Sequence, residues 1–349
     1  MANQIAKFKK YVALLDEVYQ NESKTAVLES DATLAQAGAN ANEIVIPKLD
    51  MDGLGDYDRN SGYVNGDVAM TNETVQFNYD RGRKFSIDNM DNEETAGLAF
   101  GKLAAEFIRT KVVPEQDAFR FAKYASLAGT KKKETLSAGT DVLAALQTAT
   151  SAMDNDEVPS ENRHLFITPA LLIAAQNVDT NKSRDILGAF ATITKVPTAR
   201  FMTLVGLLDG KTTGETQGGF TKVATKFKAT TDEAVIDGKT YYTRSGAGTS
   251  ASPYVFTAVA EPAPASIASY YEVDTDGSHT LNFLIAEKSA IMQYTKHRVD
   301  KAIPPEDNPD ADAWIFNFRE YGLADMYENK TAGVYASYNG ADIKQEMKA

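Results

Sequence analysis

The chain contains no cysteine, one tryptophan and only three histidines among its 349 residues. The absence of cysteine excludes disulfides, thiolate catalysis and cysteine-ligated metals. The histidines are His164, His279 and His297; no two of them stand at the spacing of metal ligands, and the motif HExxH is absent. Histidine and cysteine chemistry therefore offers no candidate for catalysis or for a metal site.

Long apolar runs are missing too: no stretch of about 18 apolar residues occurs, so no membrane-spanning helix is expected. The first residues, MANQIAKFKKYVALLDEVY, lack the apolar core and the cleavage site of a signal peptide. Positive charge is the third shortage, since 36 basic against 48 acidic side chains give a net charge of −12. This balance is opposite to that of a free-standing nucleic-acid binder, and near DNA it favours repulsion.

The most prominent feature that the chain does have is a long helical pattern from Asp88 to Gly129. A capping-box-like pair, Asp91 and Glu94, is expected to begin one long helix, Pro114 to kink it and Gly129 to end it. Apolar side chains recur at helical spacing on two adjacent stripes. The packing candidates on these stripes are Phe100, Leu103, Phe107, Ile108 and Phe119. Such a helix is too long for one small core, so other elements or other subunits are expected to contact it on several sides.

Before the long helix, the pattern is that of an arm followed by an extended hairpin. Residues 3–20 are predicted to form an amphipathic helix, and a polar Ala/Asn-rich passage follows it. EIVIPKLD, ETVQFNYD and RKFSID are predicted to be strands, with a Gly-, Asp- and Asn-rich stretch between the first two. We therefore predict a long two-stranded excursion with a flexible tip, whose candidate tip residues are Asp56, Tyr57, Asp58 and Arg59.

After Gly129, helical and strand patterns alternate. A helix is predicted at 141–153, and a strand followed by a helix in RHLFITPALLIAAQ, with Thr168 at the N-cap and Pro169 at the first helical position. Residues 222–277 are predicted to form a small all-β module. LNFLIAEKSAIMQ is predicted as a strand that runs into a short helix, and AWIFNFREY, GLADMYENK and TAGVYASY as strands. Together these elements indicate an α+β fold.

Two motifs suggest ligand binding, and each has a plainer interpretation. Gly206–Thr212 resembles a phosphate-binding loop but has three residues between its glycines where four are needed, so a β-turn is favoured. The tyrosines of the 222–277 module fit either a carbohydrate- or partner-binding surface or the filling of a thin core. These tyrosines are Tyr241, Tyr242, Tyr254, Tyr270 and Tyr271.

An acidic cluster at the predicted hairpin tip invites a calcium interpretation. The calcium-loop pattern fails there, because Leu54 occupies the fifth position and Ser61 replaces the closing glutamate. A flexible acidic tip is the favoured interpretation of Asp50, Asp52, Asp56 and Asp58. The residues thus nominate no catalytic group, no cofactor site and no metal site, and the chain is predicted not to be an enzyme.

Several stretches carry a resemblance through their order along the chain. They are DGLGDYDRNSGYVNGDV, the DRGRKFSIDNMDNEET entry to the long helix, EFIRTKVVPEQDAFRFAKYAS, NRHLFITPALL, KVPTARF with GETQGGF, and NFLIAEKSAIMQYTKHR with DADAWIFNFREYGLADMYENKTAGVYAS. In this order they resemble the major capsid (coat) proteins of tailed bacteriophages, which have the Hong Kong phage-type coat fold. The matching stretches cover most of the chain.

The resemblance implies a division of the chain into named parts. These are an N-terminal arm (1–38), an E-loop (39–88), a P-domain spine helix (89–136), an A-domain (137–221 and 278–300), and P-domain strands with a C-terminal tail (301–349). The all-β module at 222–277 has no counterpart in the minimal fold. It is expected to be an insertion in the A-domain that lies on the outer surface.

The resemblance also implies a function. The chain is expected to be a structural subunit of an icosahedral phage head, which self-assembles into hexamers and pentamers and forms the shell around packaged double-stranded DNA without sequence-specific binding. Its expected location is the virion, after assembly in the bacterial host cytoplasm. Beyond itself, the expected partners are a separate scaffolding protein, because the chain begins at an arm helix without a scaffolding-type prodomain, and a portal. A decoration protein is a further candidate.

Two alternative functions stay open at this point. An encapsulin-like nanocompartment would share the fold and would hold an enzyme cargo in place of DNA. A soluble glycan-binding or adhesin protein would use the tyrosine-rich module and would be a monomer. The content of purified particles distinguishes the first alternative, and glycan binding by a monomer the second.

Overall fold

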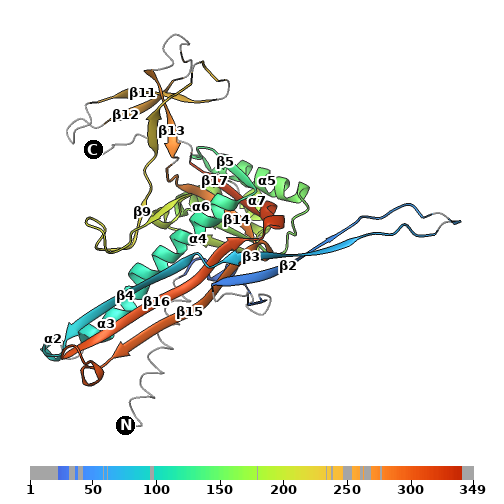
Figure 1. Cartoon of the computed structure of the whole chain (residues 1–349). Coiled ribbons are helices and arrows are strands. Elements are labelled where there is room, and N and C mark those ends of the chain that lie inside the picture. The colour runs from blue at the N-terminus through green and yellow to red at the C-terminus, as the bar shows by residue number, and fades with distance from the viewer. Residues whose placement is uncertain are drawn as a thin grey trace. The chain divides into compact units, whose positions relative to one another are not determined.

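The computed structural model describes residues 23–30, 36–37, 42–57, 59–60, 62–94, 98–178, 180–232, 234–236, 239–246, 254–259, 262, 269–275 and 277–339. Most of the predicted arm, with its helix at 3–20, lies outside these residues. The described part holds long helices and several separate sheets (Figure 1), which confirms the predicted α+β class. The chain forms two compact units. The described parts of unit 1 are Val27–Ala104 and Ile291–Asp325, and those of unit 2 are residues 23–26, Ala105–Ala290 and residues 326–339.

Unit 1 contains two three-stranded sheets. The first has the order β1–β2–β3 and consists of β1 (Gln36–Ala37), β2 (Glu43–Met51) and β3 (Val68–Gln76). The second has the order β15–β16–β4 and consists of β4 (Tyr79–Asp88), β15 (Ile291–Ile303) and β16 (Ala313–Met326). β16 and β4 are antiparallel, from Ala313 opposite Asp88 to Gly322 opposite Tyr79. Single 3-10 turns occur at η1 (Ala26–Leu28) and at η7 (Pro305–Asp307).

Near the C-terminus, two segments predicted as separate strands are strand in the structure, but their division into two was wrong. AWIFNFREY and GLADM form one 14-residue strand, β16, and not two. Gly322 does not mark a break between strands: a Cβ at this position would lie 2.8 Å from the carbonyl oxygen of Tyr294, so glycine allows β15 to pass close by. The predicted short helix after LNFLIAE is a single 3-10 turn, η6 (Lys288–Ala290), after which the chain enters β15 directly.

The long helical pattern forms consecutive helical segments: α2 (Asn89–Glu94), α3 (Leu98–Phe107), the π-helical segment η3 (Ile108–Val112) and α4 (Val113–Leu127). The helix begins earlier than predicted, because the Asp88 side chain caps it by accepting the Met90 N–H at 2.9 Å. The π-helical segment directly precedes Pro114, and Val113 N–H donates to the Ile108 carbonyl five residues back. A wider turn accommodates the ring and missing N–H of proline. The irregularity that Pro114 predicted therefore takes the form of a π-helical segment.

Gly129 ends the helical run as predicted, but for a different physical reason. It does not adopt a left-handed conformation. Its N–H donates to the Thr331 carbonyl at 2.8 Å, and a Cβ there would lie 2.7 Å from the same oxygen. The close passage of another backbone segment, and not a turn conformation, therefore requires glycine at this position.

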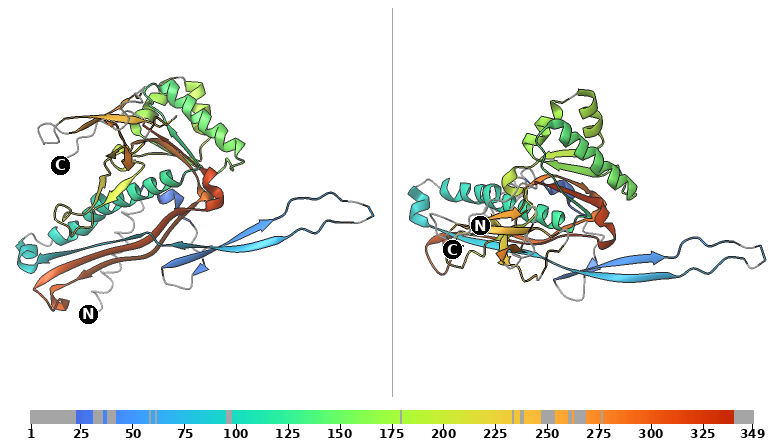
Figure 2. Two further views of the ribbon diagram at one scale, coloured as in Figure 1. Left: turned by 45° about the horizontal axis from the view of Figure 1, so that its top comes forward. Right: turned by 90° about the horizontal axis from the view of Figure 1, so that it is seen from above.

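Unit 2 is centred on a mixed five-stranded sheet with helices on both faces (Figures 1 and 2). In spatial order its strands are β5 (Thr130–Lys133), β17 (Val334–Tyr338), β14 (Leu281–Glu287), β6 (Arg163–Ile167) and β7 (Thr192–Lys195). Side chains alternate between the faces along each strand. Leu165 and Phe283 pack into one buried cluster with α5 (Gly139–Asn155), α6 (Pro169–Gln176) and α7 (Thr180–Gly188). Phe166 faces the other way, with its ring centroid 5.2 Å from that of Phe121 on α4.

The start of α6 confirms the positions that the sequence predicts. Thr168 is the N-cap and Pro169 the first helical residue. The Thr168 hydroxyl makes no capping hydrogen bond; its carbonyl accepts the Leu172 N–H at 3.1 Å. The predicted helix at 141–153 lies within α5.

The segment predicted as an all-β module contains a four-stranded sheet with the order β10–β13–β11–β12. Its strands are β10 (Lys226–Ala229), β11 (Tyr241–Ser245), β12 (Val255–Val259) and β13 (Tyr271–Thr275). A separate two-stranded sheet joins β8 (Val205–Leu207) to β9 (Phe220–Lys222), and short 3-10 segments occur at η4 (Thr198–Arg200) and η8 (Glu328–Gly333).

Gly139 offers a test of packing within unit 2. A Cβ at this first residue of α5 would lie 2.1 Å from the Ala174 carbonyl oxygen, which belongs to the backbone and has little freedom to move. Gly139→Ala is therefore expected to destabilise the protein by about 1–3 kcal/mol in urea denaturation. Gly188→Ala is the control, since nothing lies within 4 Å of its Cβ position. A wild-type urea midpoint for Gly139→Ala would contradict this packing.

Candidate subunit-contact hairpin

The most unusual part of unit 1 is the hairpin formed by β2 and β3 (Figures 1 and 2). The two strands pair antiparallel in an unbroken register from Glu43 opposite Gln76 to Met51 opposite Val68. The short strand β1 pairs with β2 only at Ile44 and Val45. Among the described residues, the ladder beyond these two positions therefore has two strands and no covering third strand. This arrangement matches the predicted two-stranded excursion, whereas RKFSID belongs to β4 in the other sheet.

Beyond the ladder, the tip of the hairpin is held by local contacts. Asp52 N–H donates to the Asp67 carbonyl at 3.2 Å, and the Asp52 carboxylate accepts the Asp67 N–H at 2.7 Å. The Tyr57 and Tyr63 rings lie 4.9 Å apart. Of the predicted tip residues, Asp56, Tyr57 and Arg59 are exposed, and Asp58 lies outside the described residues. Within the described chain, no group of three acidic or histidine side chains has a metal-binding arrangement.

The hairpin exposes an unusual number of large apolar side chains. Met51 is 63% exposed, Met70 69%, and Leu54 is fully exposed. The others on this hairpin are Tyr57, Tyr63, Val64 and Val68. A cluster of exposed apolar side chains on an extended element is typical of a protein contact site. Burying one such side chain contributes about 1.5–3 kcal/mol.

At its base the hairpin is fixed to the second sheet of unit 1. The Asn78 side chain bonds the Ala324 backbone twice, donating to its carbonyl at 2.7 Å and accepting its N–H at 3.1 Å. The centre of the Phe77 ring lies 4.9 Å from that of the Tyr321 ring in a tilted arrangement, and the Lys296 ammonium lies 4.8 Å from the centre of the Phe77 ring. These contacts hold the root of the hairpin against β15 and β16.

A second link joins β4 to β16 just beyond that root. Arg319 donates two hydrogen bonds to Asp80, from Nε at 2.9 Å and from Nη2 at 2.8 Å. These hydrogen bonds lower the pKa of Asp80, against the opposing effect of partial burial. Both side chains are about half exposed, so the ion pair adds little to the free energy of unfolding. Its two parallel hydrogen bonds mainly fix the position of β4 relative to β16.

The predicted packing residues of the helical run differ in their burial. Ile108 is fully buried at the start of η3, while Leu103, Phe107 and Phe119 are half-buried. Phe100 lies in α3, and its side chain is outside the described set. That the half-buried residues contact neighbouring subunits stays a prediction.

The loop at Gly206–Thr212 is a local turn, as the sequence predicts. The Asp209 carboxylate accepts the N–H groups of Lys211 and Thr212 and the Thr212 hydroxyl, at 2.7, 2.9 and 2.6 Å. The Thr212 hydroxyl and these two N–H groups lower the pKa of Asp209 to about 2. Gly210 has a positive φ of 71°, which suits glycine in a tight turn. The carboxylate thus occupies the N–H groups that a phosphate would need.

His164 and the tyrosines of the 222–277 module have roles inside the fold. His164 Nδ1 lies 2.8 Å from the Thr192 hydroxyl on the neighbouring strand, and burial lowers the pKa of its imidazole. Tyr241 and Tyr270 form a small buried cluster with Val259. The Tyr241 hydroxyl donates to Asp232 at 2.7 Å. Two of the five tyrosines therefore fill the thin core of this sheet.

Comparisons with known proteins yield no matching family model and no matching curated protein. Among solved structures, the chain is similar to a protein of Mycobacterium phage Che8, with 12% identity over 85% of each chain and a TM-score of 0.48. It is also similar to the capsid structure of the cyanophage P-SCSP1u, with 11% identity over 87% of this chain and 85% of that one and a TM-score of 0.46. A third is the virus-like particle from Pyrococcus furiosus, with 10% identity over 95% and 99% and a TM-score of 0.46.

These identities and TM-scores are too low for a function to be transferred to the chain. Within the described part of the chain, no helix combines the length and hydropathy that crossing a membrane requires.

Sequence reasoning located the hairpin but missed the residues that fasten it. Asn78 lies within ETVQFNYD, which is predicted to be one strand, whereas the structure divides this stretch between the end of β3 and the start of β4. Its two hydrogen bonds reach Ala324, which is 246 positions away. For the Asp80–Arg319 ion pair, the sequence offered one signal, namely opposite charges on two predicted strands. Oppositely charged residues on different strands are too common for this signal to identify a pair.

The exposed apolar side chains lead to a test of the hairpin. The double variant Leu54→Asp/Met70→Asp is expected to keep the wild-type thermal midpoint, because neither residue packs in the fold, and to lose most self-association in sedimentation velocity. Ile236→Asp is the control, since Ile236 is also half exposed but lies far along the chain in unit 2. Wild-type association of the double variant would show that the hairpin makes no contact.

Proposed function

We propose that this chain is a structural subunit of an icosahedral bacteriophage head. The observation that carries the proposal is the β2–β3 hairpin, which is anchored at its base and exposes Met51, Leu54 and Met70 along its length. An apolar element of this kind needs a surface to cover it. The partner that we propose is a further copy of the same chain.

A contact of the proposed kind can repeat to form closed rings. A hairpin that docks on a different surface of the next copy makes a heterologous contact, and repetition of such a contact forms a ring when the rotation closes. Hexamers and pentamers are the rings that an icosahedral shell needs. The hairpin corresponds to the E-loop of the resembling coat proteins, and the helical run from α2 to α4 corresponds to their spine helix.

The composition supports a subunit that encloses DNA over one that binds DNA tightly. A net charge of −12 disfavours tight binding of DNA, so packaged double-stranded DNA would be enclosed without sequence-specific contacts. Without cysteine, the shell is held together by contacts other than disulfides. No catalytic role is proposed for any residue.

The remaining assignments follow from the same proposal. Residues 1–38 act as an arm, 39–88 as the E-loop, 137–221 with 278–300 as the A-domain, and 222–277 as an inserted outer module. A separate scaffolding protein and a portal take part in assembly in the bacterial cytoplasm, and the finished protein resides in the virion. A decoration protein is a further candidate partner.

Electron microscopy of the particles, combined with analysis of their content, tests the proposal. We expect the expressed chain, alone or with a scaffolding protein, to form closed shells of uniform size, and native particles to contain nuclease-protected DNA. Particles that hold an enzyme cargo would favour an encapsulin-like compartment instead. A chain that stays monomeric and binds glycans would favour an adhesin, and either result would overturn the phage-head proposal.

A further inference from the structure

Asp117 is a buried charge in the middle of α4. It shares one helix face with Val113, Phe121 and Tyr124, and all four side chains are between 0% and 1% exposed. The same face also carries the buried side chain of Arg120, and the carboxylate of Asp117 is its acidic group. Burial of a carboxylate is strongly unfavourable unless hydrogen bonds or a cation compensate it.

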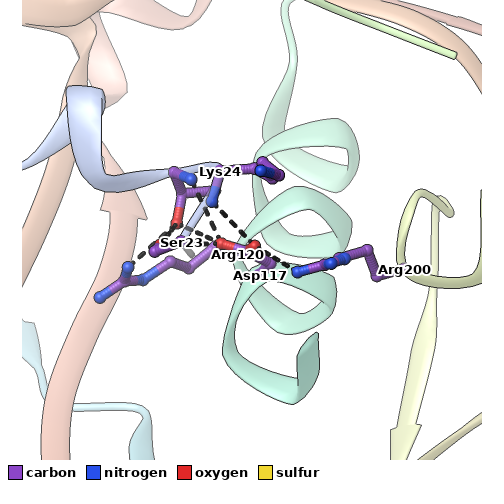
Figure 3. A network of polar contacts seen from close by, with 6 residues as sticks. Ser23, Lys24, Asp117, Arg120 and Arg200 are labelled. Carbon is purple, nitrogen blue, oxygen red and sulfur yellow. Dashed lines mark hydrogen bonds and ion pairs between the residues drawn. The ribbon is translucent and has the colours of Figure 1, made fainter. Parts of the chain in front are cut away.

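The hydrogen bonds that compensate Asp117 come from outside its helix (Figure 3). Oδ1 accepts the Ser23 hydroxyl at 3.0 Å, the Thr25 hydroxyl at 2.8 Å and the Thr25 N–H at 3.2 Å. Oδ2 accepts the Lys24 N–H at 3.0 Å and Arg200 Nη1 at 3.1 Å. Four of these five donors belong to the segment Ser23–Thr25, and the fifth follows Pro197 in η4.

The segment Ser23–Thr25 in turn relies on the Asp117 carboxylate to satisfy its own polar groups. Thr25 is fully buried, and its hydroxyl also accepts a hydrogen bond from Arg120 Nη1 at 3.0 Å. Two consecutive backbone N–H groups, those of Lys24 and Thr25, point at one anion in the manner of an anion-binding nest. Charge-assisted hydrogen bonds of this kind are roughly twice as strong as neutral ones.

We propose that Asp117 is the positioning residue for the N-terminal segment of the chain. By accepting these hydrogen bonds, it fixes Ser23–Thr25 against α4 within unit 2. Without the carboxylate, the segment loses four hydrogen bonds at once, while the aromatic contacts of Phe121 with Phe166 and Phe201 persist. The consequence for assembly rests on the proposed function, whereas the anchoring itself does not.

Hydrogen–deuterium exchange of the full-length Asp117→Asn protein tests the anchoring. An amide cannot accept the full donor set, because its nitrogen would face further donors. The amides of Lys24 and Thr25 are expected to exchange about tenfold faster or more, whereas those of β6 and β14 keep wild-type rates. Glu106→Gln is the matched control, since it makes the same chemical change in an exposed ion pair of the same helical run.

A second variant covers the case in which Asp117→Asn does not fold. Thr25→Val removes one hydroxyl donor to Asp117 and the acceptor of the Arg120 hydrogen bond without replacing any residue of α4, and it should likewise speed exchange at Lys24 and Thr25. Unchanged exchange at these two amides in either folded variant would overturn the proposal, as would an equal rise throughout unit 2.

Particle formation adds a separate readout. If the phage-head proposal holds, Asp117→Asn gives soluble subunits with a strongly reduced yield of closed particles, and Glu106→Gln gives the wild-type yield. A wild-type chain that forms no particles would contradict the proposed function and leave the exchange result standing. Wild-type particle yield from Asp117→Asn with fast exchange at Lys24 would contradict the role of Asp117 in assembly.

Discussion

The structure of unit 1 depends on one constraint: a two-stranded ladder has no interior of its own. An isolated hairpin is marginal in water, because neither of its faces is covered by a second layer. The β2–β3 hairpin nevertheless keeps a nine-pair register and exposes Met51, Leu54 and Met70. Asn78 and Phe77 fix its base to β16. The rest of the hairpin can therefore extend away from this sheet without further contacts to it. In the proposed shell, a second copy of the chain would supply the missing layer.

Unit 2 has a different organisation, because its five-stranded sheet is covered by helices on both faces. Its central strands β14 and β6 are buried throughout, and α5 to α7 cover one face while α4 covers the other. The four-stranded sheet of β10 to β13 is a separate sheet of this unit, with its own small core around Tyr241 and Tyr270. Asp117 is one of the charged side chains buried in this unit, and the segment Ser23–Thr25 supplies most of the hydrogen bonds that it accepts.

Elements whose signal is local were predictable from the sequence. The short strand predicted at EIVIPKLD corresponds to β2, and Thr168–Pro169 located the first turn of α6. The tip residues Asp56, Tyr57 and Arg59 were recognised from their turn-rich context and are exposed. Errors arose where distant contacts decide the structure: Gly322 lies inside a strand because β15 passes close to it, and Asp88 displaces Asp91 as the helix cap. An aspartate on an apolar helix stripe, Asp117, was a visible signal, but its partners lie about ninety positions away.

Oxidative footprinting of methionines measures most directly whether other copies cover the hairpin. Met51 and Met70 are 63% and 69% exposed in the single chain, and Met90 on α2, at 64%, provides a reference in the same molecule. Mild peroxide converts accessible methionine to its sulfoxide, which mass spectrometry quantifies at each position. In assembled particles, Met51 and Met70 are expected to oxidise several times more slowly, relative to Met90, than in dissociated subunits. Equal relative rates in particles and subunits would contradict the account.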